Sequence, residues 1–109
     1  MFFISNSGKT REILELEYLV KRMHPHIKII GLTGNTKGDM GQFCDVLLST
    51  GNPVEVCPLG LTPTTSTTVM TVVGDILVVL MMEKINFTKD EYAKRHHSGY
   101  LGHRAKGGQ

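Results

Sequence analysis

The feature that most constrains the fold is an alternation of short apolar runs with a segment of helical periodicity. Apolar runs cover residues 1–4, 27–32 and 45–49, and small or polar residues follow each of them. Between the first two runs, apolar side chains recur at helical spacing over residues 13–20. Strands that alternate with helices form a parallel sheet, whose ligands bind at the carboxyl ends of the strands. The sequence therefore predicts an α/β fold with its site in the loops after the strands.

The loop after the first run, Ser5-Asn6-Ser7-Gly8-Lys9-Thr10, contains a Gly-Lys-Thr tripeptide. An ATP-binding P-loop needs a second glycine five residues before Gly-Lys, and Phe3 occupies that position, so the spacing excludes a P-loop. The loop instead leads into a helix, with Thr10 as the expected N-cap, where backbone N–H groups and the helix dipole favour an anion. The hydroxyls of Ser5, Ser7 and Thr10 could hydrogen-bond phosphate oxygens. An ordinary strand-to-helix turn is the alternative.

Composition narrows the possible classes of protein. The 109 residues are enough for one domain, and 12 basic against 10 acidic residues leave no basic patch of the kind that binds nucleic acid. Cys44 and Cys57 form no CxxC motif, which indicates free thiols in a reducing cytosol. The five histidines have no cysteine or carboxylate partners at ligand spacing, so we expect no metal. No signal peptide is visible.

The most apolar stretch covers residues 69–82, and we expect it to lie in a long helix over residues 64–84 that starts with the threonine-rich segment 64–68. Those 14 residues are too few to span a bilayer, and Asp75 lies in their middle. We expect a buried core helix, central to the domain or to a subunit interface.

Five motifs in one register resemble the arabinose 5-phosphate isomerases, which are sugar isomerase (SIS) domain proteins. EVCPLGLTPTTSTT at 55–68 resembles the EACPLGLAPTSSTT segment of that family, and ISNSGKT at 4–10 resembles its phosphosugar loop. LTGN at 32–35 and GDIL at 74–77 match a turn and the long helix of the family. Residues 87–96, FTKDEYAKRH, resemble the start of its FTxxDFAxxHPGGxLGR ending.

The resemblance implies a three-layer parallel sheet with flanking helices and flavodoxin-like topology. Residues 1–104 would be the C-terminal portion of an SIS domain, and 105–109 a polar tail. The family normally begins with a further strand and a GxGKS loop that supplies a lysine to the active site, and many bacterial members carry CBS domains. Neither has a counterpart in this sequence, so we expect an SIS domain that is incomplete at its N-terminus.

The implied reaction is the interconversion of D-ribulose 5-phosphate and D-arabinose 5-phosphate through an enediol, without metal or organic cofactor, in the 3-deoxy-D-manno-octulosonate branch of lipopolysaccharide biosynthesis. Two residues, Glu55 and His96, fall at the acid–base positions of the family. The resemblance places the substrate phosphate on Ser5, Ser7, Gly8 and Thr10, with further substrate contacts at Thr33, Gly34, Thr65 and Ser66. It also implies a cytoplasmic homo-oligomer that binds neither nucleic acid nor membrane.

The sequence departs from the family pattern at two places, and these differences keep other functions open. Lys9 replaces a glutamate that is common in bacterial enzymes, and the HPGG motif reads His96-His97-Ser98-Gly99. A non-catalytic SIS module that binds a sugar phosphate, or an inactive truncated remnant, are therefore the alternatives to an active isomerase.

Overall fold

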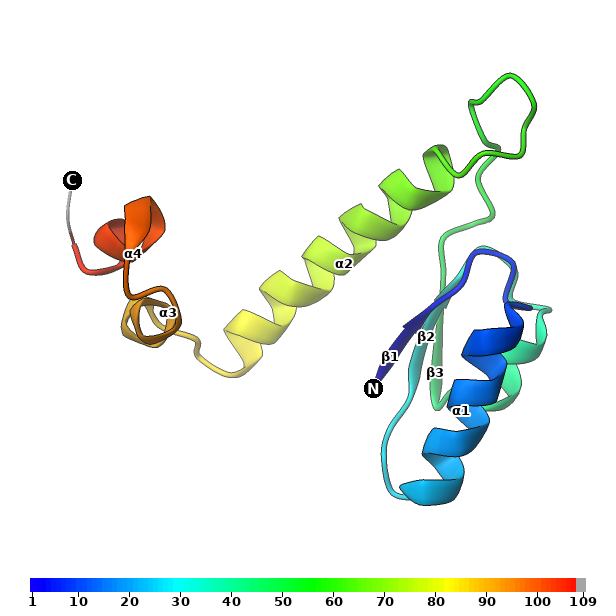
Figure 1. The fold of residues 1–109 in the computed structure, drawn as a ribbon, viewed down its shortest axis with the longest axis horizontal. Helices are drawn as coiled ribbons and strands as arrows, with labels where there is room; N and C mark the ends of the chain where they lie inside the picture. Colours follow the sequence, from blue (N-terminus) through cyan, green and yellow to red (C-terminus); the bar gives the residue numbers. More distant parts are fainter. Residues whose placement is uncertain (108–109) are drawn as a thin grey trace. The chain divides into compact units, whose positions relative to one another are not determined.

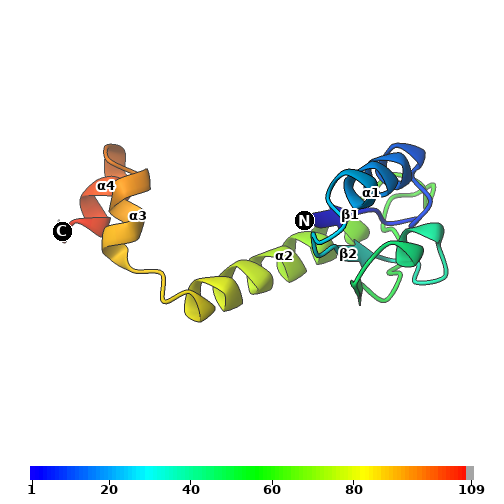
Figure 2. The same ribbon diagram turned by 90° about the horizontal axis from the view of Figure 1, so that it is seen from below.

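The structure, a computed structural model, describes residues 1–107, which form two compact units, Met1–Val73 and residues 74–107 (Figures 1 and 2). The first unit holds the sheet and the start of the long helix, and the second holds the rest of that helix and two short helices. The elements in chain order are β1 (Phe2–Ile4), α1 (Arg11–Met23), β2 (Ile30–Thr33), the 3₁₀ helix η1 (Asp39–Gln42), β3 (Val46–Ser49), α2 (Thr65–Lys84), α3 (Lys89–Arg95) and α4 (Gly99–Ala105).

The three strands form one parallel sheet in the order β1-β2-β3. Phe3 pairs with Gly31, and Gly31 with Leu47, so the strands are in step and their carboxyl ends share one edge. The prediction of a parallel sheet with flanking helices is confirmed. All three predicted strands are present, and the short helix η1 lies between β2 and β3.

Helix α1 packs on the sheet through the apolar stripe that the sequence predicts. Val20 of α1 joins Phe3, Ile29 and Met40 in a buried core, and Ile13, Leu14, Ile27 and Cys44 pack against it. Burying one such aliphatic side chain contributes about 1.5–3 kcal/mol. The core therefore fixes α1 to the face of the sheet, and the start of α1 to the loop after β1.

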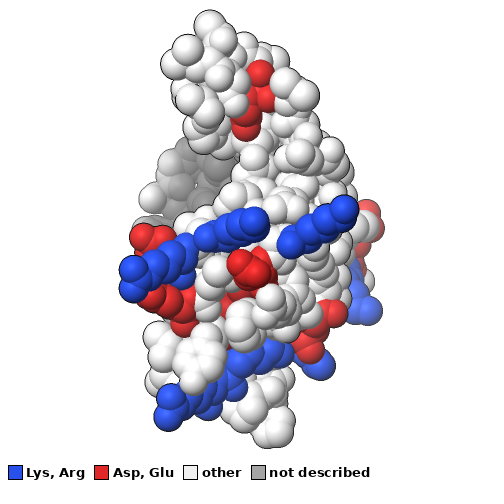
Figure 3. Space-filling view, turned by 90° about the vertical axis from the view of Figure 1, so that its right-hand side faces the viewer, with Lys and Arg blue, Asp and Glu red and all other residues white. Residues whose placement is uncertain are grey.

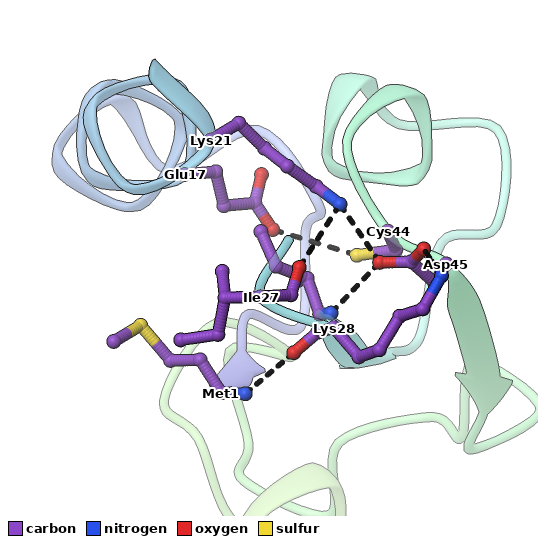
Figure 4. A network of polar contacts seen from close by, with 8 residues as sticks. Met1, Glu17, Lys21, Ile27, Lys28, Cys44 and Asp45 are labelled. Carbon is purple, nitrogen blue, oxygen red and sulfur yellow. Dashed lines mark hydrogen bonds and ion pairs between the residues drawn. The ribbon is translucent and has the colours of Figure 1, made fainter. Parts of the chain in front are cut away.

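Asp45 ties the residues before β2 to helix α1 (Figure 4). Its carboxylate accepts hydrogen bonds from Lys21 Nζ at 2.8 Å, Lys28 Nζ at 2.9 Å and the Ile29 amide at 2.9 Å. The hydrogen bonds from Lys21, Ile29 and Lys28 hold the pKa of Asp45 far below its ordinary value. This end of the unit is thus fixed by charged hydrogen bonds.

Charges of both signs lie side by side on the surface. On the face drawn in Figure 3, the side chains of lysine and arginine lie among those of aspartate and glutamate. Ion pairs between opposite charges occur on the surface, such as Arg11 Nε with Glu15 Oε1 at 2.7 Å on α1. Because the two signs are interspersed, this face does not present the single-sign field that attracts a nucleic-acid backbone.

Glu17 is a buried carboxyl on the inner face of α1. It is 0% exposed, and its Oε1 accepts the Cys44 thiol at 3.5 Å while its Oε2 is buried without a partner among the described residues (Figure 4). Burial raises the pKa of Glu17 and, with the nearby Glu17 charge, raises the pKa of the Cys44 thiol to about 11. Burial therefore favours the neutral form of both groups.

The expectation of a buried core helix is wrong for α2 within this chain. Ser66 is its one buried residue, and Ile76 in its middle is 53% exposed. The predicted extent of the helix, residues 64–84, is confirmed to within one residue, because α2 covers 20 residues from Thr65 to Lys84. By length and composition alone α2 could cross a membrane, a test that core helices of soluble proteins and signal sequences also pass. An apolar pattern on all faces predicts that a helix is packed against other surfaces, but it does not predict whether those surfaces belong to the same chain or to another.

In the second unit, the side chain of Thr88 caps the N-terminus of α3. Thr88 Oγ1 accepts the Glu91 amide at 3.2 Å. Helix α4 packs against α3, and the Cα of Gly102 lies so close to the His96 carbonyl that a side chain there would clash. Of the expected polar tail, Ala105 is the last residue of α4, and residues 108–109 lie outside the described residues.

Candidate functional site

The loop between β1 and α1 brings two of the predicted phosphate ligands together. Ser5 Oγ and Thr10 Oγ1 lie 2.7 Å apart, and the Ser5 amide donates to the Leu32 carbonyl of β2 at 3.0 Å. Thr10 occupies the N-cap position of α1, as predicted, but its side chain makes no capping bond and pairs with Ser5 instead. Ser7 is exposed, and its Oγ accepts the Lys9 amide at 3.1 Å.

The start of α1 offers hydrogen-bond donors to this loop. The first amides of a helix have no carbonyl partner within the helix, and the positive end of the helix dipole lies beside them. Among the described residues, the amides of Thr10, Arg11 and Glu12 have no hydrogen-bond acceptor. The loop therefore combines hydroxyls with free backbone donors at the carboxyl end of β1, which is a favourable arrangement for an anion.

Gly8 is required by the backbone of this loop. Its φ is +62°, and a Cβ there would lie 2.9 Å from the Asn35 carbonyl oxygen. Gly38 is equally confined, because a Cβ would lie 2.7 Å from the Gly8 carbonyl oxygen. Both glycines allow the loop after β1 to pack closely on the loop after β2.

The loop after β2 supports the first loop. Thr33 is 0% exposed, its Oγ1 donates to the Asn6 carbonyl at 3.3 Å, and the Gly34 amide donates to the same carbonyl at 3.1 Å. Asn35 Nδ2 donates to the Ser7 carbonyl at 3.0 Å. The proposed substrate contacts at Thr33 and Gly34 stay predictions, and the contacts observed for both are to the loop itself.

Sequence reasoning did not select Asn35 or Asn6. Asn35 is part of the LTGN match. Asparagine is common in turns because its side chain can bond the backbone two residues further on. That signal predicts a turn, but it gives no indication that the side chain also reaches a second loop.

Glu55 is anchored to the first turn of α2. Its Oε2 accepts the Thr64 amide at 2.7 Å, the Thr64 hydroxyl at 2.8 Å and the Ser66 amide at 3.3 Å. Hydrogen bonds from Ser66 and Thr64 lower the pKa of Glu55 to about 2, so the carboxylate is ionised at neutral pH. The hydroxyl of Thr65 is buried without a partner in the same part of the chain.

His96 lies in the second unit, at the C-terminal end of α3. Its imidazole stacks on Tyr92 with ring centroids 4.3 Å apart, and its amide donates to the Tyr92 carbonyl at 3.0 Å. The structure therefore groups Ser5 with Thr10 and Glu55 with Thr64 and Ser66, while His96 belongs to another unit. No cluster of three metal-binding side chains occurs among residues 1–107.

The geometry defines an α/β protein with a parallel sheet and a hydroxyl-rich loop at its carboxyl edge, an arrangement that favours an anion. The family model of the SIS domain matches residues 1–80, and the chain belongs to that family. An arabinose 5-phosphate isomerase, KdsD, of Yersinia pestis is 43% identical over 99 residues, and KdsD of Escherichia coli K12 is 41% identical. Each alignment covers 91% of this chain but 30% of the relative, so the chain spans under a third of the length of these enzymes.

Solved structures agree with this assignment. A Bacteroides fragilis protein described as a phosphosugar isomerase involved in capsule formation has a TM-score of 0.85 and 60% identity, covering 91% of this chain and 52% of its own. The protein c3406 of E. coli CFT073, solved in complex with arabinose 5-phosphate, has a TM-score of 0.78 and 33% identity, covering 87% of this chain and 50% of its own. The chain is thus an SIS domain of the phosphosugar isomerase type that spans about half of these solved chains.

Proposed function

We propose that this chain contributes the phosphate-binding and acid–base residues of an isomerase that interconverts D-ribulose 5-phosphate and D-arabinose 5-phosphate. The observation that supports this most is the paired hydroxyls of Ser5 and Thr10 at the start of α1. There they can donate to phosphate oxygens beside the amides of Arg11 and Glu12, which have no acceptor among the described residues. Ser7 and Gly8 complete the loop around the phosphate.

The isomerisation moves a proton between C1 and C2 of the sugar and another between the two oxygens. In the proposed mechanism, Glu55 takes the C1 proton of ribulose 5-phosphate through Oε1 and returns it to C2 of the enediol. Its Oε2, held by Thr64 and Ser66, keeps the carboxylate in place during the transfer. His96 shuttles the hydroxyl proton, a role that suits an imidazole near neutral pH. Thr65 and Ser66 would then contact the sugar, and no metal or organic cofactor takes part.

A sugar-phosphate-binding module without turnover is the second candidate. Lys9 stands where glutamate is common in the bacterial enzymes, and the two proposed acid–base residues lie in different units of the chain. We further propose that the active form is a cytoplasmic homo-oligomer that supplies the 3-deoxy-D-manno-octulosonate branch of lipopolysaccharide biosynthesis.

Conversion of ribulose 5-phosphate tests the proposal. The chain is assayed alone and after co-expression with the half of the Bacteroides fragilis relative that it does not cover. We expect little turnover alone and recovered turnover with the added half, reduced about 100-fold or more by Glu55→Gln and by His96→Asn. Glu83→Gln, an exposed carboxylate at the end of α2, is the matched control. Turnover that survives both site variants would contradict the acid–base roles, and binding without turnover would favour the module.

A further inference from the structure

A few hydrogen bonds connect the loop of residues 5–10, which follows β1, to the loop after β2. The Gly34 amide and Thr33 Oγ1 both donate to the Asn6 carbonyl, and the Met40 amide donates to the Gly8 carbonyl at 3.0 Å. These contacts fix the two ends of the segment Asn6–Gly8. The middle residue, Ser7, is exposed.

Asn35 supplies the side-chain contact to this middle residue. Its Nδ2 donates to the Ser7 carbonyl at 3.0 Å, and its Oδ1 accepts the Lys37 amide at 3.1 Å. Its own amide donates to the buried Thr33 hydroxyl at 3.1 Å. Three hydrogen bonds therefore hold this half-buried residue in a fixed orientation, and one of them reaches across to the other loop.

We propose that Asn35 is a positioning residue that holds Ser7 in the conformation that binds phosphate. This inference rests on the proposed function and adds a residue to its site. Fixing the Ser7 carbonyl fixes the adjacent peptide unit, whose Gly8 amide donates to the Ser5 carbonyl at 3.2 Å. It also restrains the Ser7 hydroxyl, which accepts from the Lys9 amide and keeps its own proton to donate. A site whose donors are already oriented loses less entropy when the anion binds. Asn35 touches no substrate in this role and acts only through Ser7.

The test uses the variant Asn35→Ser in the full chain. A serine keeps a short hydroxyl acceptor for the Lys37 amide, although a weaker one, and it cannot reach the Ser7 carbonyl. The matched control is Gln42→Ala, which removes an exposed side-chain amide from η1. Amide hydrogen exchange of the unliganded proteins is measured first. We expect the Gly8 and Lys9 amides to exchange about tenfold faster in Asn35→Ser, the factor expected for one lost hydrogen bond, while the core strands exchange unchanged.

The second readout is affinity for arabinose 5-phosphate and for D-arabinose. We expect Asn35→Ser to weaken the first about tenfold and to leave the second unchanged, with the thermal midpoint close to that of wild type. Unchanged exchange at Gly8 and Lys9, or an equal loss for both sugars, would overturn the inference. A wild-type chain that does not prefer the phosphorylated sugar would instead contradict the proposed function, and faster loop exchange would still be observed. The two failures are therefore distinguishable.

Discussion

The hydroxyl oxygens of Ser5 and Thr10 lie 2.7 Å apart, one at the end of β1 and the other at the N-cap of α1. In the absence of an anion one hydroxyl donates to the other. A bound phosphate can accept from both, because each hydroxyl can rotate its proton towards a new acceptor. The pair is therefore suited to exchange an internal hydrogen bond for two bonds to a ligand.

Replacing either hydroxyl should weaken phosphate binding without unfolding the chain. We expect Ser5→Ala and Thr10→Val each to reduce the affinity for arabinose 5-phosphate about tenfold, because each removes one donor to a charged group. Titration calorimetry measures the change. Thr36→Ala, an exposed hydroxyl in the neighbouring loop, is the control. Affinity that is unaffected by both site variants would place the phosphate elsewhere.

Glu55 should stabilise the folded chain at neutral pH and lose this effect in acid. Hydrogen bonds from Ser66 and Thr64 lower the pKa of Glu55 from 4.5 to about 2. A lowered pKa means that the unfolded chain takes up the proton first, so the contribution is present above pH 4.5 and is lost as the pH falls towards 2. Asp45, with a pKa lowered in the same direction, adds to the same loss.

Urea unfolding between pH 7 and pH 2 measures this dependence. We expect the unfolding free energy of wild type to fall more steeply with acidification than that of Glu55→Gln or Asp45→Asn. Glu12→Gln, an exposed carboxylate on α1, should follow wild type. Parallel curves for all four proteins would mean that these carboxylates are not hydrogen-bonded in solution as they are in this structure.

Glu17 should change the stability of the chain with pH in the opposite direction to Glu55. Its buried carboxyl has a raised pKa, so the folded chain keeps the proton longer than the unfolded chain does. The stabilisation is then full below the ordinary value of 4.5 and is lost as the pH rises through the raised value. Glu17→Gln keeps the shape and removes the titration, so its stability should change less above pH 4.5 than that of wild type. A variant that is as pH-dependent as wild type would rule out this assignment.

The sequence predicted those parts of the fold that depend on local pattern. The apolar stripe of Ile13, Leu14 and Val20 identified α1, and three short apolar runs identified the three strands. The start of β2 was placed three residues too early. Ile27 belongs to a turn that begins at His24, and the Ile29 amide is bonded to the Asp45 carboxylate. Both contacts depend on the tertiary structure and leave no local signal.

For the candidate site, the sequence predicted the positions of residues but not the contacts between them. Placing Thr10 at the N-cap was correct, but its bond to Ser5 was not foreseeable, because a threonine there can cap its helix or pair with a neighbouring hydroxyl. The family resemblance selected Glu55, yet only the structure shows that three donors from the start of α2 hold one of its oxygens. The exposure of α2 could not be predicted, because periodicity does not say which surface covers an apolar helix.

The exposed apolar surface of α2 should drive association. Val73 and Leu77 are half-buried in this chain, while Ile76 and Val79 are exposed. In the associated protein we expect Val73→Asp or Leu77→Asp to cost about 3 kcal/mol or more, because each places an unpaired charge in an apolar contact. Sedimentation velocity and urea unfolding test this, with Thr71→Asp on the same helix as the control. A loss below roughly 0.5 kcal/mol and unchanged sedimentation would mean that α2 is not covered in solution.

The most direct test of the central claim is the affinity of the wild-type chain for arabinose 5-phosphate compared with unphosphorylated D-arabinose. Titration calorimetry at neutral pH gives both values under one condition. We predict that the phosphate improves binding about 100-fold, since several charge-assisted hydrogen bonds at the start of α1 recognise it. Equal affinity for the two sugars, or no binding of either, would contradict the proposal that the loop from Ser5 to Thr10 is a sugar-phosphate site.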